Sequence, residues 1–286
     1  MAMIAERRGG PPGWLDPIGR VGRLTTAGLG YLGAAALLTL HAAAAVARGR
    51  DDEDQPSLYA ATTHELSWML WAGLPLVGLV HVAMGSFLSM QAYFGSTFVD
   101  GTGAVVGVGL LRNLATMLTG LTMAGLLPGR IVPEFRRKRP ASPGRAVAAR
   151  IAAATIAGPL LALWGCAVGT LVGWKSSQAL MGLSTDMYFL MLLRMLWFRD
   201  VVGLVVKGAL FCGAAAAMAC AEGLHHHRGE PAESADVDPV PAAVVGVLRA
   251  TCLAMAAILV MNMAWFIFVY HAVPVYGPSL LQPPTP

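Results

Sequence analysis

The chain has 286 residues, of which 56% are hydrophobic and 13% are charged, and its mean hydropathy is +0.61. Soluble domains carry about 25% charged residues, so this composition excludes an ordinary soluble protein and predicts a polytopic membrane protein. The net charge of +4 does not indicate a nucleic-acid-binding protein, because most of the excess lies in one short segment between two apolar stretches. Such a segment favours anionic lipid headgroups and acidic protein surfaces as partners.

Both ends of the chain, residues 1–13 and 274–286, are rich in Gly and Pro and are predicted to be a disordered N-terminus and a flexible C-terminal tail. They flank one predicted membrane domain, residues 14–273. Residues 14–24 (WLDPIGRVGRL) combine bulky apolar residues with two arginines, which suits an amphipathic helix lying at the membrane interface. Residues 26–47 are apolar but are dominated by Ala and Gly.

Later stretches are apolar over the about 20 residues that a bilayer-spanning helix needs. They are residues 66–92, 103–127, 151–174, 201–222 and 242–270. Residues 175–200 hold Arg194, Arg199 and Asp200 beside bulky apolar residues, a pattern that suits an interfacial or re-entrant helix. The predicted fold is therefore all-α, with an N-terminal interfacial or elbow helix followed by about five transmembrane helices.

The predicted loop 129–150 gives the strongest topological signal. Its one acid is Glu134, and its seven basic residues are Arg130, Arg136, Arg137, Lys138, Arg139, Arg145 and Arg150. Short loops rich in Lys and Arg favour the cytoplasmic side of a membrane. We therefore expect a multi-pass protein of the bacterial inner membrane with the loops 129–150 and 223–241 in the cytoplasm. The loop 93–102 and the C-terminus would then face outward.

The status of residues 26–47 decides the topology. If they span the membrane and the N-terminus is cytoplasmic, the basic loop falls outside, which contradicts the positive-inside tendency. If they form an elbow, five spans remain and the basic loop is cytoplasmic. Six spans with an external N-terminus are the alternative that the sequence leaves open.

Small residues recur at the spacing of one helix face. Gly165, Gly169 and Gly173 form two successive GxxxG units, and Gly103 and Gly107 form another. This spacing allows two helices to approach closely. The face predicts packing either within one subunit or at a subunit interface.

Ionisable residues inside spans are costly and indicate function, unless the side chain extends to the membrane surface. Arg112 and Lys207 occupy such positions. His81 is interpreted as a hydrogen-bonded core residue and the four cysteines as free and buried, and no metal site or cofactor is expected. The sequence contains no nucleophile elbow, Walker loop, HExxH or Rossmann fingerprint, so a partner chain would have to bind any nucleotide.

The chain resembles the MlaE/YrbE permease family, the membrane subunits of lipid-handling ABC transporters that work with MCE-domain proteins. The resemblance extends over residues 14–270 and rests on short signatures in a fixed order. These are Gly85–Gln91 with Phe94 and Gly95, Arg112-Asn113-Leu114, Leu118-Thr119, Ala124-Gly125, Glu134, Arg150, Pro159, Val168–Trp174, Arg199–Gly203, Lys207, Phe211, Gly213, Cys220 and Gly223.

The resemblance implies a permease subunit that does no chemistry itself and moves a phospholipid, fatty acid, sterol or similar molecule. It implies as partners a second permease, like or unlike, a cytoplasmic ABC ATPase that binds the ATP, and MCE-domain proteins. Its candidate residues for the ATPase-facing surface are Arg130, Glu134, Arg136 and Arg137. Its intramembrane polar candidates are Gln91, Arg112 and Lys207. The abundance of Ala, Gly and Arg favours a GC-rich source such as an actinobacterium.

The chain also departs from the family pattern. Asn113 stands where the family has Glu, Thr116 where it has Pro, and Leu126 where it has Arg. The segment between Arg139 and Arg150 is shorter than in the family and lacks the piece that resembles its coupling helix. These departures favour an alternative function, a diverged and transport-inactive membrane scaffold or assembly subunit. A third hypothesis is an intramembrane enzyme that uses Glu65, His81 and Arg112.

Overall fold

The computed structural model describes residues 16–47, 57–95, 102–138, 140–229 and 239–272. These residues form the helices α1 (Asp16–Ala47), α2 (Leu58–Gly95), α3 (Thr102–Gly109), α4 (Ala115–Arg137), α5 (Pro143–Met181), α6 (Thr185–Met195), α7 (Phe198–Gly229) and α8 (Pro239–Ala272). A π-helical turn, η2 (Leu110–Leu114), joins α3 to α4. The predicted all-α fold is confirmed. The predicted tails lie outside the described residues.

Five helical segments of the described chain are long and apolar enough to cross a membrane, which confirms the predicted number of spans. They are Leu58–Phe94, Val106–Arg137, Pro143–Met181, Phe198–Leu224 and Ala243–Val269. The α2 and α5 helices, with 38 and 39 residues, are each almost 60 Å long at about 1.5 Å per residue. The hydrocarbon core of a bilayer is about 30 Å thick, so these helices must be tilted or their ends must project beyond the core.

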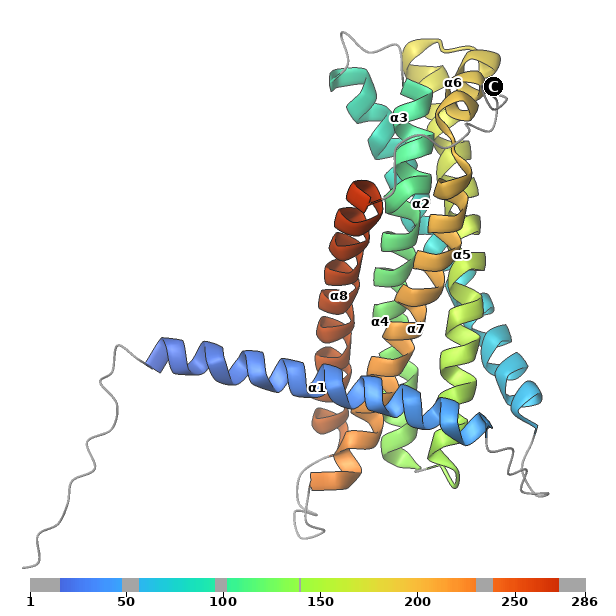
Figure 1. The fold of residues 1–286 in the computed structure, drawn as a ribbon. Helices are drawn as coiled ribbons and strands as arrows, with labels where there is room; N and C mark the ends of the chain where they lie inside the picture. Colours follow the sequence, from blue (N-terminus) through green and yellow to red (C-terminus); the bar gives the residue numbers. More distant parts are fainter. Residues whose placement is uncertain (1–15, 48–56, 96–101, 139, 230–238, 273–286) are drawn as a thin grey trace, which may run out of the picture.

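The N-terminal helix α1 crosses the lower end of the bundle instead of running along it (Figure 1). Its apolar part, Gly28–Ala44, is shorter than a membrane span, so the six-span alternative is not supported. Ala35 and Ala42 are buried, and the Tyr31 hydroxyl donates to the Met218 carbonyl of α7 at 2.9 Å. The two predicted N-terminal elements are corrected to one continuous helix, because no residue between them interrupts the helical backbone.

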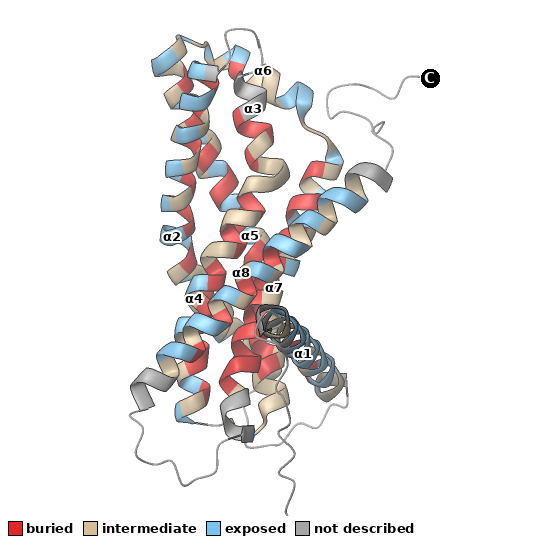
Figure 2. Cartoon of the chain, turned by 90° about the vertical axis from the view of Figure 1, so that its left-hand side faces the viewer, coloured by how far each residue is buried: buried red, intermediate tan, exposed pale blue. Residues whose placement is uncertain are grey.

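Many buried residues lie on α4, α5 and α7, which pack against one another, and these residues are the red parts of the ribbon in Figure 2. The α8 helix packs against α4 and α7 at the edge of the bundle. Its outward face is apolar and exposed, with Leu248, Val260 and Phe268 among its side chains. Cys252 on this helix is also exposed, whereas the other cysteines are buried, so the prediction of four buried cysteines is wrong for Cys252.

The α2 and α5 helices pack through two stripes of residues spaced four apart. The α2 stripe is Val77, His81, Gly85 and Ser89, and the α5 stripe is Gly165, Gly169, Gly173 and Ser177. A Cβ atom on Gly85 would lie 2.3 Å from the Gly169 carbonyl oxygen, and one on Gly165 would lie 2.6 Å from the His81 ring. The Ser89 hydroxyl donates to the Gly173 carbonyl at 2.9 Å. The predicted GxxxG face therefore packs against another helix of the same chain.

The predicted basic loop 129–150 is wrong in extent. The α4 helix continues to Arg137 and α5 begins at Pro143, so only residues 138–142 connect them. Proline suits the first turn of a helix because its missing N–H has no partner there in any case. Most of the basic residues consequently lie on two helix ends. These ends share the lower end of the bundle with the end of α7 and the start of α8, whereas α6 lies at the upper end (Figure 1).

The predicted interfacial stretch 175–200 is divided among three helices. The α5 helix continues to Met181, where Gly182 adopts a left-handed conformation with a φ of 64°, which glycine accommodates without strain. Ser184 then caps α6 by accepting a hydrogen bond from the Met187 N–H. The two other predicted loops overlap the ends of helices. The first residues of the predicted loop 93–102 belong to α2, which ends at Gly95, and the first residues of the predicted loop 223–241 belong to α7, which ends at Gly229. Residues 96–101 and 230–238 lie outside the described part.

Candidate functional site

Charged side chains of the spans gather in two layers near the ends of the bundle. Arg112 and Asp200 belong to the upper layer, and Arg130 and Glu222 to the lower layer. Arg112 and Arg130 are separated by 18 residues of continuous helix, or about 27 Å, and Asp200 and Glu222 by 22 residues, or about 33 Å. Both separations are close to the thickness of the hydrocarbon core of a bilayer, which is about 30 Å. The two layers therefore fit the two boundaries of the membrane.

Lys207 lies between these layers. In the five described span segments, it is the one Lys, Arg, Asp or Glu residue found between the upper and lower layers. It is seven residues from Asp200 along α7, or about 10 Å into the apolar region. Lys207 is only 2% exposed, so it is buried inside the protein and its side chain does not extend to a membrane surface. Charged residues at this depth are costly and indicate a functional position.

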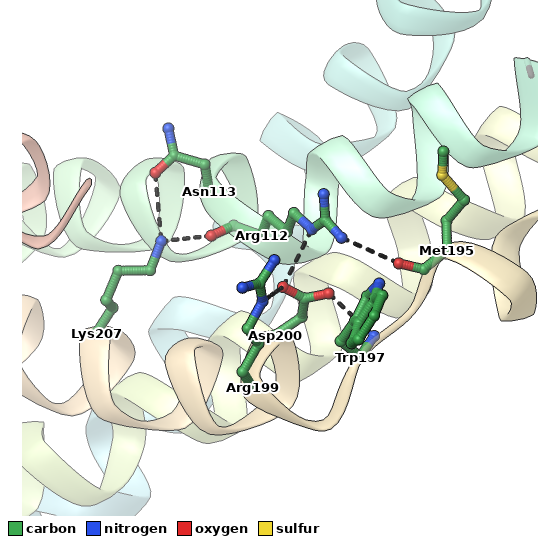
Figure 3. Close-up of polar contacts among 7 residues, drawn as sticks. All are labelled: Arg112, Asn113, Met195, Trp197, Arg199, Asp200 and Lys207. Atoms are coloured by element: carbon green, nitrogen blue, oxygen red, sulfur yellow. Dashed lines mark hydrogen bonds and ion pairs between the residues drawn. The ribbon is translucent and has the colours of Figure 1, made fainter. Parts of the chain in front are cut away.

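The Lys207 ammonium group is held by oxygen atoms of the π-helical turn. It donates to the Arg112 carbonyl and to the Asn113 Oδ1 atom at 3.3 Å, as Figure 3 shows. In this turn the Ala115 N–H bonds to the Leu110 carbonyl, five residues back. Single π-turns inside α-helices are rare and occur frequently at functional sites. Both oxygens are uncharged, so the immediate hydrogen-bond partners leave the charge of Lys207 uncompensated.

Arg112 links the same turn to the start of α7. Its Nε atom donates to Asp200 Oδ1 at 3.1 Å, and its Nη2 atom donates to the Met195 carbonyl at 3.0 Å. Asp200 also accepts from the Trp197 N–H at 3.0 Å through Oδ2. Asp200 is therefore the centre of the upper layer, because it fixes both Arg112 and the connection between α6 and α7 (Figure 3).

The lower layer contains a ring of alternating charges from three helices. Glu65 of α2 lies 3.5 Å from Arg130 of α4 and 3.2 Å from Arg150 of α5. Glu134 of α4 lies 2.6 Å from Arg150 and 4.0 Å from Arg130. We call these four residues the charge ring. Trp68 stacks against the Arg130 guanidinium at 4.1 Å and Phe135 against that of Arg150 at 4.4 Å.

A second ionic group of the lower layer ties α4 to α7 and α8. Glu222 is 1% exposed and lies 3.2 Å from Arg136 and 3.6 Å from Arg249. Burial, together with the nearby negative charge of Glu222, raises the pKa of Tyr31 above its usual range. Arg136 thus takes part in packing inside the chain, whereas Arg137 and Lys138 are exposed at the end of α4.

The other sequence candidates occupy separate places. Gln91 is on the exposed surface of α2, away from the buried stripe. His81 is buried, with its Nδ1 atom 2.7 Å from the Val77 carbonyl. Glu65 and His81 are 16 residues apart on one helix, or about 24 Å, so the three residues of the enzyme hypothesis form no common site. Within the described ranges, no group of three His, Cys, Asp or Glu residues could hold a metal ion.

Three acids of these clusters, Asp200, Glu65 and Glu222, were not predicted from sequence as members of an ionic cluster, and Glu65 was named only in the enzyme hypothesis. Each lies at the end of a span, where a charged residue is common and by itself uninformative. Arg112 and Lys207 were recognised because a cation inside a span is rare. The arginine partners of the three acids on other helices lie between 27 and 88 residues away in the chain, and only the spacing of Arg130 and Glu134 by four residues gave a local signal.

Comparison with known proteins gives two matches. Residues 141–265 match the family model described as Permease MlaE. A probable ABC transporter permease protein of Rickettsia typhi is 25% identical over 191 residues, which are 61% of this chain and 74% of that protein. Both matches agree with the resemblance seen in the sequence, and the five apolar spans make the chain a multi-pass membrane protein that is similar to membrane permeases. Both matches indicate a transporter component and not a catalytic enzyme.

Proposed function

We propose, from the membership of residues 141–265 in the MlaE permease family, that this chain is the permease subunit of an ABC transporter for lipids or other hydrophobic molecules. The proposed assembly contains a second permease, a cytoplasmic ATPase that binds the ATP, and MCE-domain proteins on the other side of the membrane. The substrate class is phospholipid, fatty acid or sterol, and the membrane is the bacterial inner membrane.

The observation that carries the proposal beyond the family match is the position of Lys207. A cation buried between the two charged layers, with carbonyl and amide oxygens as its hydrogen-bond partners, is costly for a merely structural protein. An ammonium group in this environment can attract the anionic part of an amphiphile that enters the apolar region. The Arg112–Asp200 pair would then hold the π-turn that presents these oxygens.

The proposed orientation places the α4–α5 connection in the cytoplasm. The lower end of the bundle carries Arg137, Lys138 and Arg145 near that connection, and basic segments favour the cytoplasmic side. The upper end carries Lys175, Arg194 and Arg199, so the charge difference between the ends is smaller than the sequence alone suggested. The exposed part of the ATPase-facing surface would be Glu134, Arg137 and Lys138, with Arg130 and Arg136 behind it.

The first test is reconstitution. The chain is co-expressed with a second permease, an ABC ATPase and MCE-domain proteins from the same genome, purified through a tag on the ATPase, and placed in vesicles that contain fluorescent phospholipid. The proposal predicts co-purification and ATP-dependent lipid transfer that is reduced about tenfold or more by Lys207→Met. Transfer without any dependence on this chain would contradict it. Lys175→Met, at an exposed position, is the matched control.

The alternative function is a transport-inactive scaffold, and the short α4–α5 connection favours it. Residues 138–142 leave no room for a separate helix between α4 and α5, which removes the element that the resemblance associates with ATPase docking. Under this alternative, a partner permease alone would engage the ATPase.

Charge reversal distinguishes the two functions. Arg137→Glu with Lys138→Glu changes exposed side chains at the α4–α5 connection and is expected to abolish stimulation of the ATPase if this chain docks on it. Arg194→Glu reverses an exposed charge at the upper end and serves as the control. Full stimulation by a correctly inserted double variant would favour the scaffold.

A further inference from the structure

The α2 helix consists of two parts with different attachments, which meet at Pro75. We call residues 58–74 the lower arm and residues 75–95 the upper arm. Proline inside a helix removes one backbone hydrogen bond and clashes with the preceding turn, so a helix bends most easily there. The carbonyl of the neighbouring Leu74 accepts a hydrogen bond from the Trp164 indole of α5 at 3.0 Å, which holds this point of α2 against α5.

The upper arm is closely packed. Its buried residues are Val77, Gly78, His81, Gly85, Ser89 and Ala92, and the stripe from Val77 to Ser89 interlocks with the glycines of α5. The contact between Gly85 and Gly169 leaves no space even for one methyl group. A backbone contact of this kind resists separation or rotation, because packed surfaces have few alternative arrangements. The upper arm and α5 are therefore expected to move as one unit.

The lower arm has far fewer buried residues, which are Met69 and Gly73. Its ionic attachment is Glu65, which bridges Arg130 of α4 and Arg150 of α5. Glu65 is mostly covered by protein, with 13% of its side chain exposed. Trp68, one turn further along the same arm, lies against Arg130. The charge ring thus attaches the lower arm to the two helix ends that flank the α4–α5 connection.

We propose that Glu65 is a positioning residue that makes the lower arm of α2 follow the α4–α5 helix pair, with Pro75 as the hinge. Removal of its charge releases the lower arm and leaves the upper arm in place. The inference rests on the proposed function for its purpose, because motion imposed at the α4–α5 connection by an ATPase would reach α2 through the charge ring. The attachment by Glu65 and the hinge at Pro75 are properties of this chain alone and need no partner.

The test measures the two arms separately by distances between spin labels. In the full-length chain with its four native cysteines replaced, His64→Cys with Gly129→Cys reports the lower arm against α4. Met90→Cys with Leu171→Cys reports the upper arm against α5. All four label positions are exposed. The chain is placed in lipid nanodiscs without an ATPase, and Glu65→Gln is added to each pair.

The expected result is a lower-arm distribution that shifts to longer distance and broadens, with an unchanged upper-arm distribution. Glu65→Asp, which keeps the charge, should stay close to the wild type, and Asp186→Asn, an exposed acid on α6, should change neither pair. Unchanged distances in Glu65→Gln would overturn the inference, and so would equal shifts of both pairs. Equal behaviour of Glu65→Asp and Glu65→Gln would show that the charge is not the attachment.

A further variant, in which Pro75→Ala is added to Glu65→Gln, tests the position of the hinge. Pro75→Ala restores the missing N–H, so the two arms of Glu65→Gln/Pro75→Ala should shift together or not at all. A shift confined to the lower arm in this double variant would overturn the position of the hinge. These distance measurements contain no ATPase, so they test this inference independently of the proposed function. If the inference fails, the lower arm does not move in them. If the proposed function fails, the separate reconstitution experiment shows no ATPase stimulation.

Discussion

The Nε atom of Arg112 lies 3.1 Å from Oδ1 of Asp200, a residue 88 positions later in the chain. This ion pair joins the π-helical turn after α3 to the first turn of α7. Because the pair holds the π-helical turn against α7, the position of the Arg112 carbonyl relative to Lys207 depends on how this turn packs against α7. Asp200 is 2% exposed in its side chain and Arg112 is 28% exposed, so water screens only one partner of the pair.

The first prediction concerns Asp200. Asp200→Asn removes the negative charge while keeping the size of the side chain, so Arg112 loses its ionic partner. We expect a loss of about 1–3 kcal/mol in the free energy of unfolding, measured in detergent by denaturant titration. Asp186→Asn is the control and should cost little. An Asp200→Asn protein as stable as the wild type would contradict a central role for Asp200 in the upper layer.

The second prediction concerns Asn113. Asn113→Asp places a carboxylate where the amide oxygen now lies 3.3 Å from the Lys207 ammonium group. Hydrogen bonds between charged groups are stronger than those with a neutral partner, and we expect a gain of about 1 kcal/mol in stability. The matched variant Asn113→Asp/Lys207→Met should lose this gain, because its new carboxylate has no cation. A double-mutant cycle measures the difference.

The third prediction concerns the α2–α5 contact. Gly85→Ala adds a methyl group that would lie 2.3 Å from the Gly169 carbonyl oxygen, and we expect a loss of about 1–3 kcal/mol from overpacking. Gly125→Ala is the control, since a Cβ atom there meets nothing within 4 Å and alanine should favour the helix by about 0.5–1 kcal/mol. Thermal unfolding in detergent should move in opposite directions for the two variants.

The fourth prediction concerns pH. Burial raises the pKa of the Tyr188 hydroxyl to about 12 from 10.0, so the unfolded chain releases this proton at lower pH than the folded chain. The contribution of Tyr188 to stability is therefore complete below pH 10 and is lost as the pH rises through about 12. Denaturation curves across this range should show a steeper loss for the wild type than for Tyr188→Phe. Equal slopes would contradict a buried phenol.

The fifth prediction concerns topology. In a chain without native cysteines, Ser142→Cys marks the α4–α5 connection and Asp186→Cys marks α6 at the opposite end. An impermeant maleimide added to intact cells should label position 186 and leave position 142 unlabelled until the membrane is permeabilised. Labelling of position 142 in intact cells would invert the proposed orientation.

The sequence by itself determined the class of the protein and the number of its spans. A bilayer core offers no hydrogen-bond partners to an exposed backbone, so long apolar stretches must become helices. Their number can be counted from composition. The glycines at 165, 169 and 173 likewise identified a packing face in advance, because four-residue spacing places small residues on one side of any helix.

Only the tertiary structure decided which residues these features meet. The glycine face packs against His81 and Gly85 of the same chain, a pairing that no local pattern encodes. The basic segment after Gly129 resembled a free cytoplasmic loop, but helix α4 continues through it and turns Arg130 toward Glu65, a residue of another helix. Ion pairs between helices depend on how the helices are placed side by side, and that placement follows from the packing of all the spans together.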